Sequence, residues 1–347
     1  MSEGGGATAG ARGRGARVSM ADVARLAGVS SQTVSRVSNG SPSVDPRTRA
    51  RVLAAMRELG YRPNSAARAL KRGEFRTLGV IVFTLHTTGS VRTLEAIAAS
   101  AAEEGYAITL IPVSAQTQDE VLGAFTRLGE LAVDAVIVVM EVHLVDDAVV
   151  RLPPGLPVVV ADSEADEHYT AVDTDQAGGS RAAVLHLLEL GHRTVWHLAG
   201  PQRSIAAERR ARAWRAALRE RGLPVPAPLH GDWSAESGYR LGLELAADPA
   251  CTAVFAANDQ MALGLLRALH VSGRSVPGDV SVVGFDDIPE AASFLPPLTT
   301  IRQDFAEVGR RLVAGALHRL RGGAAPRGAA VVPTGLVVRE STAPPRR

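Results

Sequence analysis

Two patterns of hydrophobic and polar positions divide the chain near residue 76. Residues 18–60 show the three-to-four-residue spacing of apolar positions that is typical of short helices, with turn signals at Gly28–Ser30 and Asn39–Pro42. From Leu78 onward, short apolar runs alternate with longer amphipathic stretches. The first pattern predicts a small all-α unit, and the second predicts βαβ units with parallel strands.

The second part of the chain is expected to form an α/β sensor of two lobes. Apolar runs predict strands at 78–83, 107–113, 135–140, 157–161, 194–199, 252–256 and 280–285. Amphipathic stretches predict helices at 92–104, 176–190, 205–221, 236–247 and 259–271. These strands are too many for one sheet, so we expect two doubly wound parallel sheets, as in periplasmic binding proteins. Such folds bind ligands at the carboxyl ends of their strands.

The domain boundaries follow from these patterns. We expect a small all-α headpiece at 18–63, a short helix and linker at 64–75, and an α/β sensor domain at 76–340. Within the sensor, the N-lobe is expected at about 76–174 and the C-lobe at about 175–303, with the chain crossing back near 303–340. The Gly- and Arg-rich residues 1–17 and the Pro- and Arg-rich residues 341–347 are expected to be disordered.

The headpiece carries the spacing that joins two helices at a tight turn. Gly28 stands where the turn needs a positive φ angle, and Ser30 can cap the second helix. Apolar and small residues form the matching faces of the two helices: Val23, Ala24, Leu26, Ala27, Val34 and Val37. This is the helix-turn-helix pattern, and an ordinary helical hairpin is the alternative.

The second helix of this pair has a polar outward face. It presents Ser31, Gln32 and Arg36, and Gln pairs with adenine, and Arg with guanine, in the major groove of DNA. Contacts to phosphate, which fix register rather than sequence, are expected from Thr33, Ser35 and Asn39.

Charge and composition support this division. The net charge is only +2, but residues 1–76 hold 14 basic and 5 acidic side chains, and the remainder holds 24 basic and 31 acidic. A basic front on an acidic body favours a polyanion-binding module joined to a different kind of domain. The single cysteine, Cys251, excludes an intramolecular disulfide and fits the cytoplasm. We see no signal peptide and no apolar run long enough for a membrane span.

Several polar groups in the sensor have the chemistry of a sugar site. Asp162, Asn258 and Asp286 each follow an apolar run, which places them at the carboxyl ends of strands. Arg210 offers a fork of donors, and Trp233 offers a flat apolar surface. Each has a plainer alternative, because Asp and Asn often cap the next helix, Trp233 can be a core residue, and Arg210 can lie at the surface.

The sequence gives little support for an enzymatic function. The sequence has no Gly-x-x-x-x-Gly-Lys-Ser/Thr phosphate loop and no His or Cys spacing for a metal, so we expect no cofactor and no metal. The Asp286–Asp287 pair could serve acid–base chemistry, but no partner is evident. A sugar-binding protein of the periplasmic type is a further alternative, and it would have a signal peptide and no helix-turn-helix.

Residues 18–72 resemble the headpiece of the LacI/GalR family of bacterial repressors, above all at Ser30–Val37. Ser31 departs from the family, since Tyr occupies this base-reading position in a sugar-responsive member. The resemblance implies a hinge at Asn64–Leu70 that becomes helical on the operator, with Leu70 wedged into the minor groove and Ala67 beside it. It also implies a homodimer on a near-palindromic operator. No heptad helix follows Gly322–Gly323, so a dimer is preferred to a tetramer.

The resemblance continues to about residue 340. It rests on the motifs Leu198–Pro201, Gly231–Ser234, Ala257–Gly264, Val282–Asp287 and Thr299–Phe305. It implies an effector site formed by Asp162, Arg210, Trp233, Asn258, Gln260, Asp286, Gln303 and Phe305. Two positions at this site differ from the sugar-responsive member. Val139 stands where that member has a polar Asn, and Thr87–Gly89 stands where it has a more apolar loop.

The sequence therefore predicts a transcriptional repressor that is released from DNA by a small-molecule effector. The expected effector is a sugar or glycoside, and the expected targets are carbohydrate uptake or catabolism genes. One alternative within the family is a regulator that needs a corepressor, such as a nucleobase or a phosphorylated metabolite.

Overall fold

The computed structural model describes residues 18–61, 73–113, 118–139, 155–161, 170–324 and 329–346. The chain forms two compact units, residues 1–75 and 76–347. The expected tail at 1–17 and the hinge residues Asn64, Ala67 and Leu70 lie outside the described residues. No helix in the described ranges is long and apolar enough to cross a membrane.

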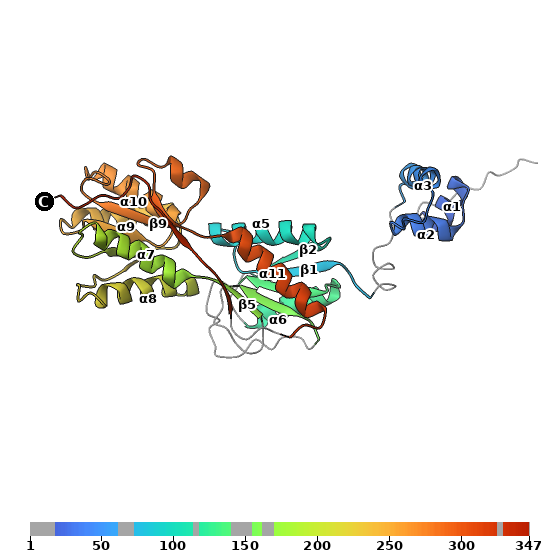
Figure 1. The fold of residues 1–347 in the computed structure, drawn as a ribbon, viewed down its shortest axis with the longest axis horizontal. Helices are drawn as coiled ribbons and strands as arrows, with labels where there is room; N and C mark the ends of the chain where they lie inside the picture. Colours follow the sequence, from blue (N-terminus) through green and yellow to red (C-terminus); the bar gives the residue numbers. More distant parts are fainter. Residues whose placement is uncertain are drawn as a thin grey trace, which may run out of the picture. The chain divides into compact units, whose positions relative to one another are not determined.

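The headpiece consists of three short helices around a small core (Figure 1). They are α1 (Met20–Ala27), α2 (Ser31–Ser38) and α3 (Pro46–Glu58). Gly28 ends α1 at φ 62°, and the Ser30 hydroxyl caps α2 by accepting the Thr33 N–H at 3.2 Å. The core residues are Val23, Ala24, Ala27, Val34, Val37, Val52, Ala55 and Met56. Leu26 was expected on this face, but it is 46% exposed because its position turns away from α2 and α3.

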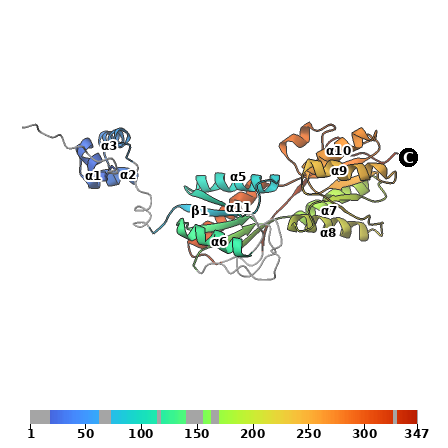
Figure 2. The ribbon, with the colours of Figure 1, turned by 180° about the vertical axis from the view of Figure 1, so that it is seen from behind.

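The N-lobe is a six-stranded parallel sheet in the order β11-β5-β4-β3-β1-β2. Its strands are β1 (Thr77–Val82), β2 (Ala107–Pro112), β3 (Ala135–Val139), β4 (Val158–Ala161), β5 (Thr170–Thr174) and β11 (Ala329–Val332). Helices α5 (Thr88–Glu103) and α11 (Phe305–Leu320) pack together over one face, and α6 (Gln118–Glu130) covers the other (Figures 1 and 2).

The C-lobe is a second six-stranded sheet in the order β12-β10-β9-β8-β6-β7, and only β12 is antiparallel. Its strands are β6 (Trp196–Ala199), β7 (Leu229–His230), β8 (Ala253–Ala256), β9 (Ser281–Asp286), β10 (Thr299–Arg302) and β12 (Gly335–Val337). Helices α7 (Gln176–Glu189) and α8 (Ile205–Arg219) cover one face, while α9 (Ala235–Ala247) and α10 (Asp259–Val271) cover the other. A short 3₁₀ helix, η1 (Pro289–Ser293), follows β9.

The chain passes between the lobes three times, after β5, after β10 and after β11. The expected architecture of a helical headpiece and two parallel-sheet lobes is confirmed. Strands β5, β7, β10, β11 and β12 lie outside the predicted runs. The sequence of β5, Thr-Ala-Val-Asp-Thr, is too polar to look like a buried strand, yet all five residues are buried because β4 and β11 flank it.

The expectation of a disordered C-terminus from residue 341 is wrong. Ser341 is fully buried, and its hydroxyl donates to the Val282 carbonyl at 2.6 Å. The Ala343 N–H donates to the Ser281 hydroxyl at 3.0 Å, and Arg346 pairs with Asp279 at 2.7 Å. The Pro- and Arg-rich composition suggested a loose tail, but its backbone is held by hydrogen bonds along β9.

Candidate nucleic-acid interface and ligand pocket

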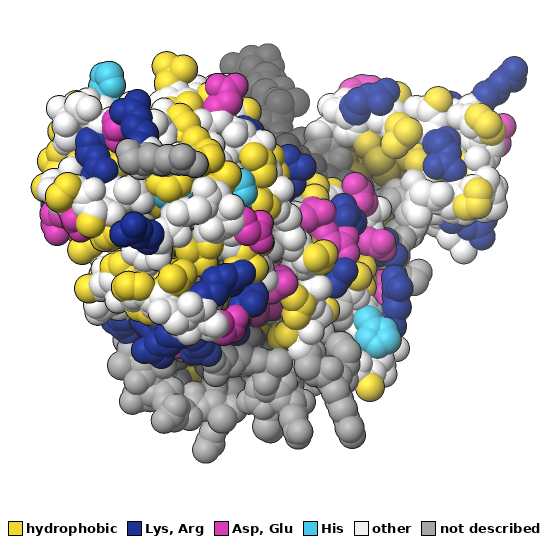
Figure 3. Space-filling model, turned by 60° about the vertical axis from the view of Figure 1, so that its left-hand side comes forward, with side chains coloured by type: hydrophobic (Ala, Val, Ile, Leu, Met, Phe, Trp, Pro, Cys, Tyr) yellow, Lys and Arg dark blue, Asp and Glu magenta, His cyan; other side chains and the backbone are white. Residues whose placement is uncertain are grey.

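Helix α2 turns a polar face to solvent and an apolar face to the headpiece core. Ser31, Gln32, Arg36 and Asn39 are exposed, and Thr33 and Ser35 are half-buried. The side chains expected to read bases therefore share one accessible surface. Arginine side chains also lie in several places on the visible face of the headpiece (Figure 3, upper right).

The side chains that were expected to contact phosphate make local hydrogen bonds within the headpiece. The Asn39 amide donates to the Ser35 hydroxyl at 3.4 Å, and the Ser30 and Thr33 hydroxyls lie 3.0 Å apart. These bonds orient the side chains on the exposed face of α2 before any contact with DNA.

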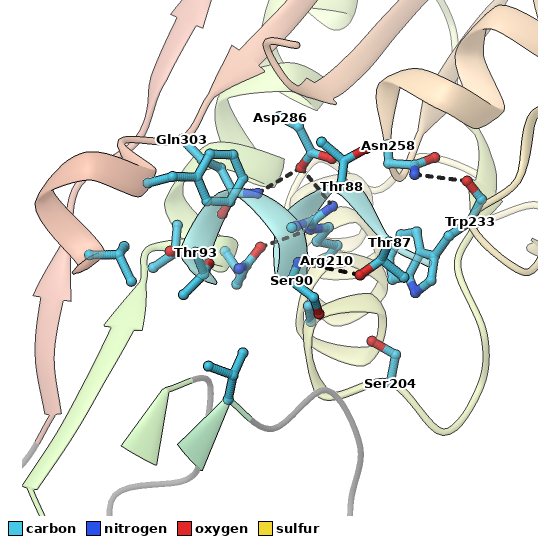
Figure 4. Close-up of a pocket in the computed structure, with 17 residues that line it drawn as sticks. Thr87, Thr88, Ser90, Thr93, Ser204, Arg210, Trp233, Asn258, Asp286 and Gln303 are labelled. Carbon is cyan, nitrogen blue, oxygen red and sulfur yellow. Dashed lines mark hydrogen bonds and ion pairs between the residues drawn. The ribbon is translucent and has the colours of Figure 1, made fainter. Parts of the chain in front are cut away.

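A pocket lies between the two lobes of the sensor, where the carboxyl ends of their strands meet (Figure 4). The space between its walls, with the open mouth included, is about 660 Å³. The N-lobe lining is Thr87, Thr88, Gly89, Ser90, Thr93, Val139, Thr174, Phe305 and Val308. The C-lobe lining is Gln176, Ser204, Ala206, Arg210, Trp233, Asn258, Asp286 and Gln303.

The structure brings most of the expected effector residues to this pocket. Those that line it are Arg210, Trp233, Asn258, Asp286, Gln303 and Phe305. Gln260 lies beside the lining rather than in it. It accepts a hydrogen bond from the Asn258 amide at 2.9 Å and donates to the Thr88 hydroxyl, so it links the lobes. Asp162 lies outside the described residues.

Arg210 projects from α8 into the centre of the site (Figure 4). Only 4% of the residue is exposed. Its Nε donates to Gln176 Oε1 at 2.8 Å, and its Nη1 donates to the Ala257 carbonyl and lies 3.6 Å from Asp286 Oδ1. The guanidinium is therefore held by a carboxylate, an amide and a carbonyl at once.

Two of the pocket residues have backbone angles that are uncommon outside glycine. Asp286 has φ 116° and Trp233 has φ 74°. Such conformations cost on the order of 1–3 kcal/mol each and persist where neighbouring contacts enforce them. At Asp286 these contacts include the Gln303 amide, which donates to Oδ1 at 2.6 Å. Close to Trp233, the site needs Gly200, because a Cβ there would stand 2.4 Å from the indole ring.

Sequence reasoning missed a group of hydroxyl and amide side chains in the lining. They are Ser90, Thr93, Thr174, Gln176 and Ser204. A signal existed for Ser204, which is the N-cap of α8 and precedes an amphipathic stretch. Val139, the expected apolar departure, lies in the lining and is 3% exposed.

Asp259 lies beneath the pocket and is fully buried. Burial raises the pKa of its carboxyl to about 8, and the nearby Asp286 adds to the shift. Its oxygens accept the Thr300 hydroxyl at 2.6 Å and the Ile288 N–H at 2.9 Å. Asp259 therefore connects β10 with the turn that follows Asp286.

We expect Asp259 to make the stability of the C-lobe pH-dependent. Its pKa is higher in the folded protein than its ordinary value of 3.8, so its contribution to stability is complete below pH 4 and declines as pH rises to about 8, by at most about 1.4 kcal/mol per pH unit. Urea unfolding at pH 5 to 8 can follow tryptophan fluorescence, because Trp196, Trp214 and Trp233 all belong to this lobe. In Asp259→Asn the dependence should flatten, and an unchanged slope would contradict this role.

An ion pair also joins the two lobes beside the pocket. Arg209 of α8 pairs with Asp173 of β5, and their side chains are 20% and 10% exposed. Asp173 also accepts the Thr174 N–H at 2.8 Å, next to the passage from β5 into α7. Arg209 thus holds the C-lobe to the N-lobe, while its neighbour Arg210 stays within the C-lobe.

Replacing Arg209 with Met should lower the free energy of unfolding of the sensor by about 1–3 kcal/mol. The Asp173 carboxylate would lose its charge-assisted hydrogen bond while remaining largely buried. Arg212→Met on the same helix is the matched control, since that side chain is 62% exposed, and it should cost less than about 0.5 kcal/mol. Equal effects of the two substitutions in urea unfolding would show that the inter-lobe ion pair contributes no more to the free energy of unfolding than an exposed ion pair.

Two protein families match this chain. The bacterial regulatory proteins of the lacI family match residues 19–64, and a periplasmic binding protein-like domain matches residues 184–342. The chain is 34% identical to the lactose operon repressor of Escherichia coli (strain K12), over 94% of this chain and 91% of that protein. It is 36% identical to the transcriptional regulator CelR of Thermobifida fusca, over 92% and 96%.

Solved structures agree with these matches. The lac repressor dimer bound to operator and the anti-inducer ONPF has a TM-score of 0.84 to this structure at 33% identity, covering 94% of this chain and 100% of that one. The complex of the regulator CelR with cellobiose has a TM-score of 0.68 at 32% identity, with the same coverage.

Proposed function

The chain belongs to the LacI family and is a DNA-binding transcriptional repressor of that type, and we propose that a neutral sugar or glycoside in the pocket between its lobes releases it from its operator. We further propose that it acts as a homodimer in the cytoplasm, on genes for carbohydrate uptake or catabolism. The observation that carries the choice of effector is the charge balance of the pocket.

The described lining contains one cationic side chain, Arg210, and one anionic side chain, Asp286. They lie 3.6 Å apart, and Gln176 and the Ala257 carbonyl also occupy the guanidinium. A phosphate or carboxylate ligand would need donors that are not already committed to a carboxylate. The remaining polar lining consists of hydroxyls and amides, which suit the donors and acceptors of sugar hydroxyls.

Apolar surface completes the match to a sugar. Trp233 and Phe305 supply aromatic faces, and Val139, Ala206 and Val308 supply smaller apolar contacts. A pyranose ring presents C–H groups on its faces and hydroxyls at its edge, so it needs both kinds of lining. The same charge balance disfavours the alternative of a phosphorylated corepressor.

An enzymatic role is disfavoured by the state of the acidic pair. Asp287 is held by Arg302 at 2.7 Å and by Arg339 at 2.6 Å, and Asp286 is held by Arg210 and Gln303. The two carboxyls are therefore engaged in separate structural contacts rather than arranged around a substrate. Repressors such as the lactose operon repressor and CelR are the relatives at full length.

Control of DNA binding would follow from the way the lobes are joined. Gln260 with Thr88, and Arg209 with Asp173, connect the lobes around the pocket. An effector that changes lobe closure therefore also acts on the N-lobe, which follows the hinge segment 64–70 in the sequence. Seven residues make a marginal helix, which small changes can favour or disfavour. A 10²-fold weakening of operator binding requires about 2.7 kcal/mol of tighter effector binding to the free form.

The dimer follows from the limited reach of one headpiece. A single recognition helix contacts only a few base pairs, so two half-sites are needed for specificity. The matched lac repressor structure is a dimer bound to operator. Sedimentation of the complex with a near-palindromic operator should show two copies per site, and a monomer on the operator would refute this part of the proposal.

A thermal-shift screen followed by operator binding tests the effector proposal. Neutral mono- and disaccharides, including cellobiose, are compared with sugar phosphates and nucleobases. We expect a neutral sugar to raise the melting temperature and to weaken operator binding. Stabilisation by sugar phosphates alone, or tighter operator binding with every hit, would overturn it.

A further inference from the structure

A column of aromatic rings crosses the C-lobe sheet beneath α8. Phe285 of β9 and Phe255 of β8 have ring centroids 6.4 Å apart. Phe255 stacks on His197 of β6 at 4.8 Å, and His197 meets Trp214 of α8 at 5.1 Å. We call these four residues the aromatic column. Each is at most 1% exposed, so the column is a packed interior element.

One end of this column supports the central pocket residue. The Arg210 guanidinium carbon lies 3.8 Å from the centroid of Phe285 and 5.4 Å from that of Trp233. Phe285 itself does not belong to the pocket lining. Guanidinium groups stack well on aromatic faces, which fixes the plane of the group rather than its edges.

The hydrogen bonds of Arg210 do not by themselves fix the plane of its guanidinium group. Gln176 Oε1, the Ala257 carbonyl and Asp286 lie around the edge of the guanidinium. Such bonds determine where the nitrogen atoms lie but allow the group to tilt about them. Phe285 closes one face, so the planar fork can adopt a single orientation toward the pocket.

The column is anchored at its far end. The Trp214 indole N–H donates to the Val195 carbonyl at 2.8 Å, and His197 Nδ1 donates to the Phe255 carbonyl at 2.9 Å. Complete burial lowers the pKa of His197 to about 3, so the ring stays neutral near Arg210. Arg210 and Trp214 are four residues apart on α8 and share one face of that helix. This face therefore contacts Phe285 at one end of the column through Arg210 and supplies Trp214 at the other end.

We infer that Phe285 is a positioning residue for effector recognition, which sets the orientation of Arg210 without touching the ligand. This inference rests on the proposed effector function of the pocket. Preorganised support of this kind lets a polar group meet a ligand without first losing its own freedom. The loss of Phe285 should therefore weaken effector binding and leave operator binding intact.

The test compares Phe285→Leu with Phe255→Leu. Both substitutions shorten a fully buried ring of the same column, but only Phe285 stacks on Arg210. With cellobiose as the ligand, together with any sugar found by thermal shift, Phe285→Leu should lose at least tenfold in effector affinity. Phe255→Leu should stay within threefold, and both should keep effector-free operator affinity within twofold. Equal losses of effector affinity in the two variants would overturn the inference.

A crystal structure of ligand-free Phe285→Leu keeps the two proposals distinguishable. If the wild-type protein binds no sugar at all, the proposed effector function fails, and the crystal structure still decides the role of Phe285. We expect the plane of the Arg210 guanidinium to tilt away from the orientation that it has over the Phe285 ring in the wild-type protein. A guanidinium that keeps its place over Leu at this position would refute the positioning role.

Discussion

Arg210→Met is expected to bind operator as tightly as the wild-type repressor and to have lost its response to effector. Arg210 is the one cationic group in the described lining, and its guanidinium is bonded to Gln176 and the Ala257 carbonyl. Hydrogen bonds to charged groups contribute about 1.5–3 kcal/mol each. Losing one such bond between Arg210 and a sugar should reduce effector affinity by roughly tenfold to 10²-fold.

The same substitution also leaves Asp286 without its ion partner. That carboxylate is 6% exposed, so its charge becomes poorly compensated and the C-lobe should be destabilised as well. Arg212→Met, on the same helix and away from the pocket, should show neither effect. The measurements are effector titration by calorimetry and operator binding by fluorescence anisotropy. An effector affinity in Arg210→Met equal to that of the wild-type protein would show that Arg210 does not contribute to effector binding.

The double variant Gln32→Ala, Arg36→Ala is expected to lose specific operator binding. Both side chains lie on the exposed face of α2, while Val34 and Val37 hold the helix from the other side. A bidentate base contact is worth about 1–3 kcal/mol. Two of them amount to a loss of roughly 30-fold to 10⁴-fold for each half-site of the operator, with the fold of the headpiece unchanged.

Arg25→Ala provides the matched control for that experiment. Arg25 is an exposed arginine of α1 that pairs with Asp22 at 3.2 Å, so its removal changes the charge but not the reading face. The double variant should retain weak, strongly salt-dependent binding to unrelated DNA, because phosphate contacts remain. Equal losses in the control and the double variant would show that charge alone, rather than base reading, governs binding.

Much of the architecture could be predicted because it depends on regular apolar patterns. The buried parallel strands β1, β3 and β9 are almost uninterrupted apolar runs, and their ends differ from the predicted ones by only a residue or two. Where tertiary neighbours override local composition, prediction fails. The polar strand β5 is buried between two others, and the C-terminal residues are held along β9.

The site was less predictable for related reasons. The helix after β1 was expected to begin at residue 92, but α5 begins at Thr88, and its extra turn carries Thr88 and Ser90 into the pocket. The segment Thr-Gly-Ser has low helix propensity, so its sequence resembles a loop. The ion pair of Arg210 with Asp286 and its stacking on Phe285 could not be predicted from local sequence. Both contacts bring together residues about 75 positions apart.

Operator and effector are expected to weaken each other's binding to this repressor. The most direct test is to titrate the sugar identified by thermal shift into the free protein and into its complex with operator. We predict that the effector binds the free protein at least tenfold more tightly, because linkage requires the coupling to be reciprocal. Equal affinity in the two titrations would contradict control of DNA binding by this pocket, and tighter binding to the complex would make the ligand a corepressor.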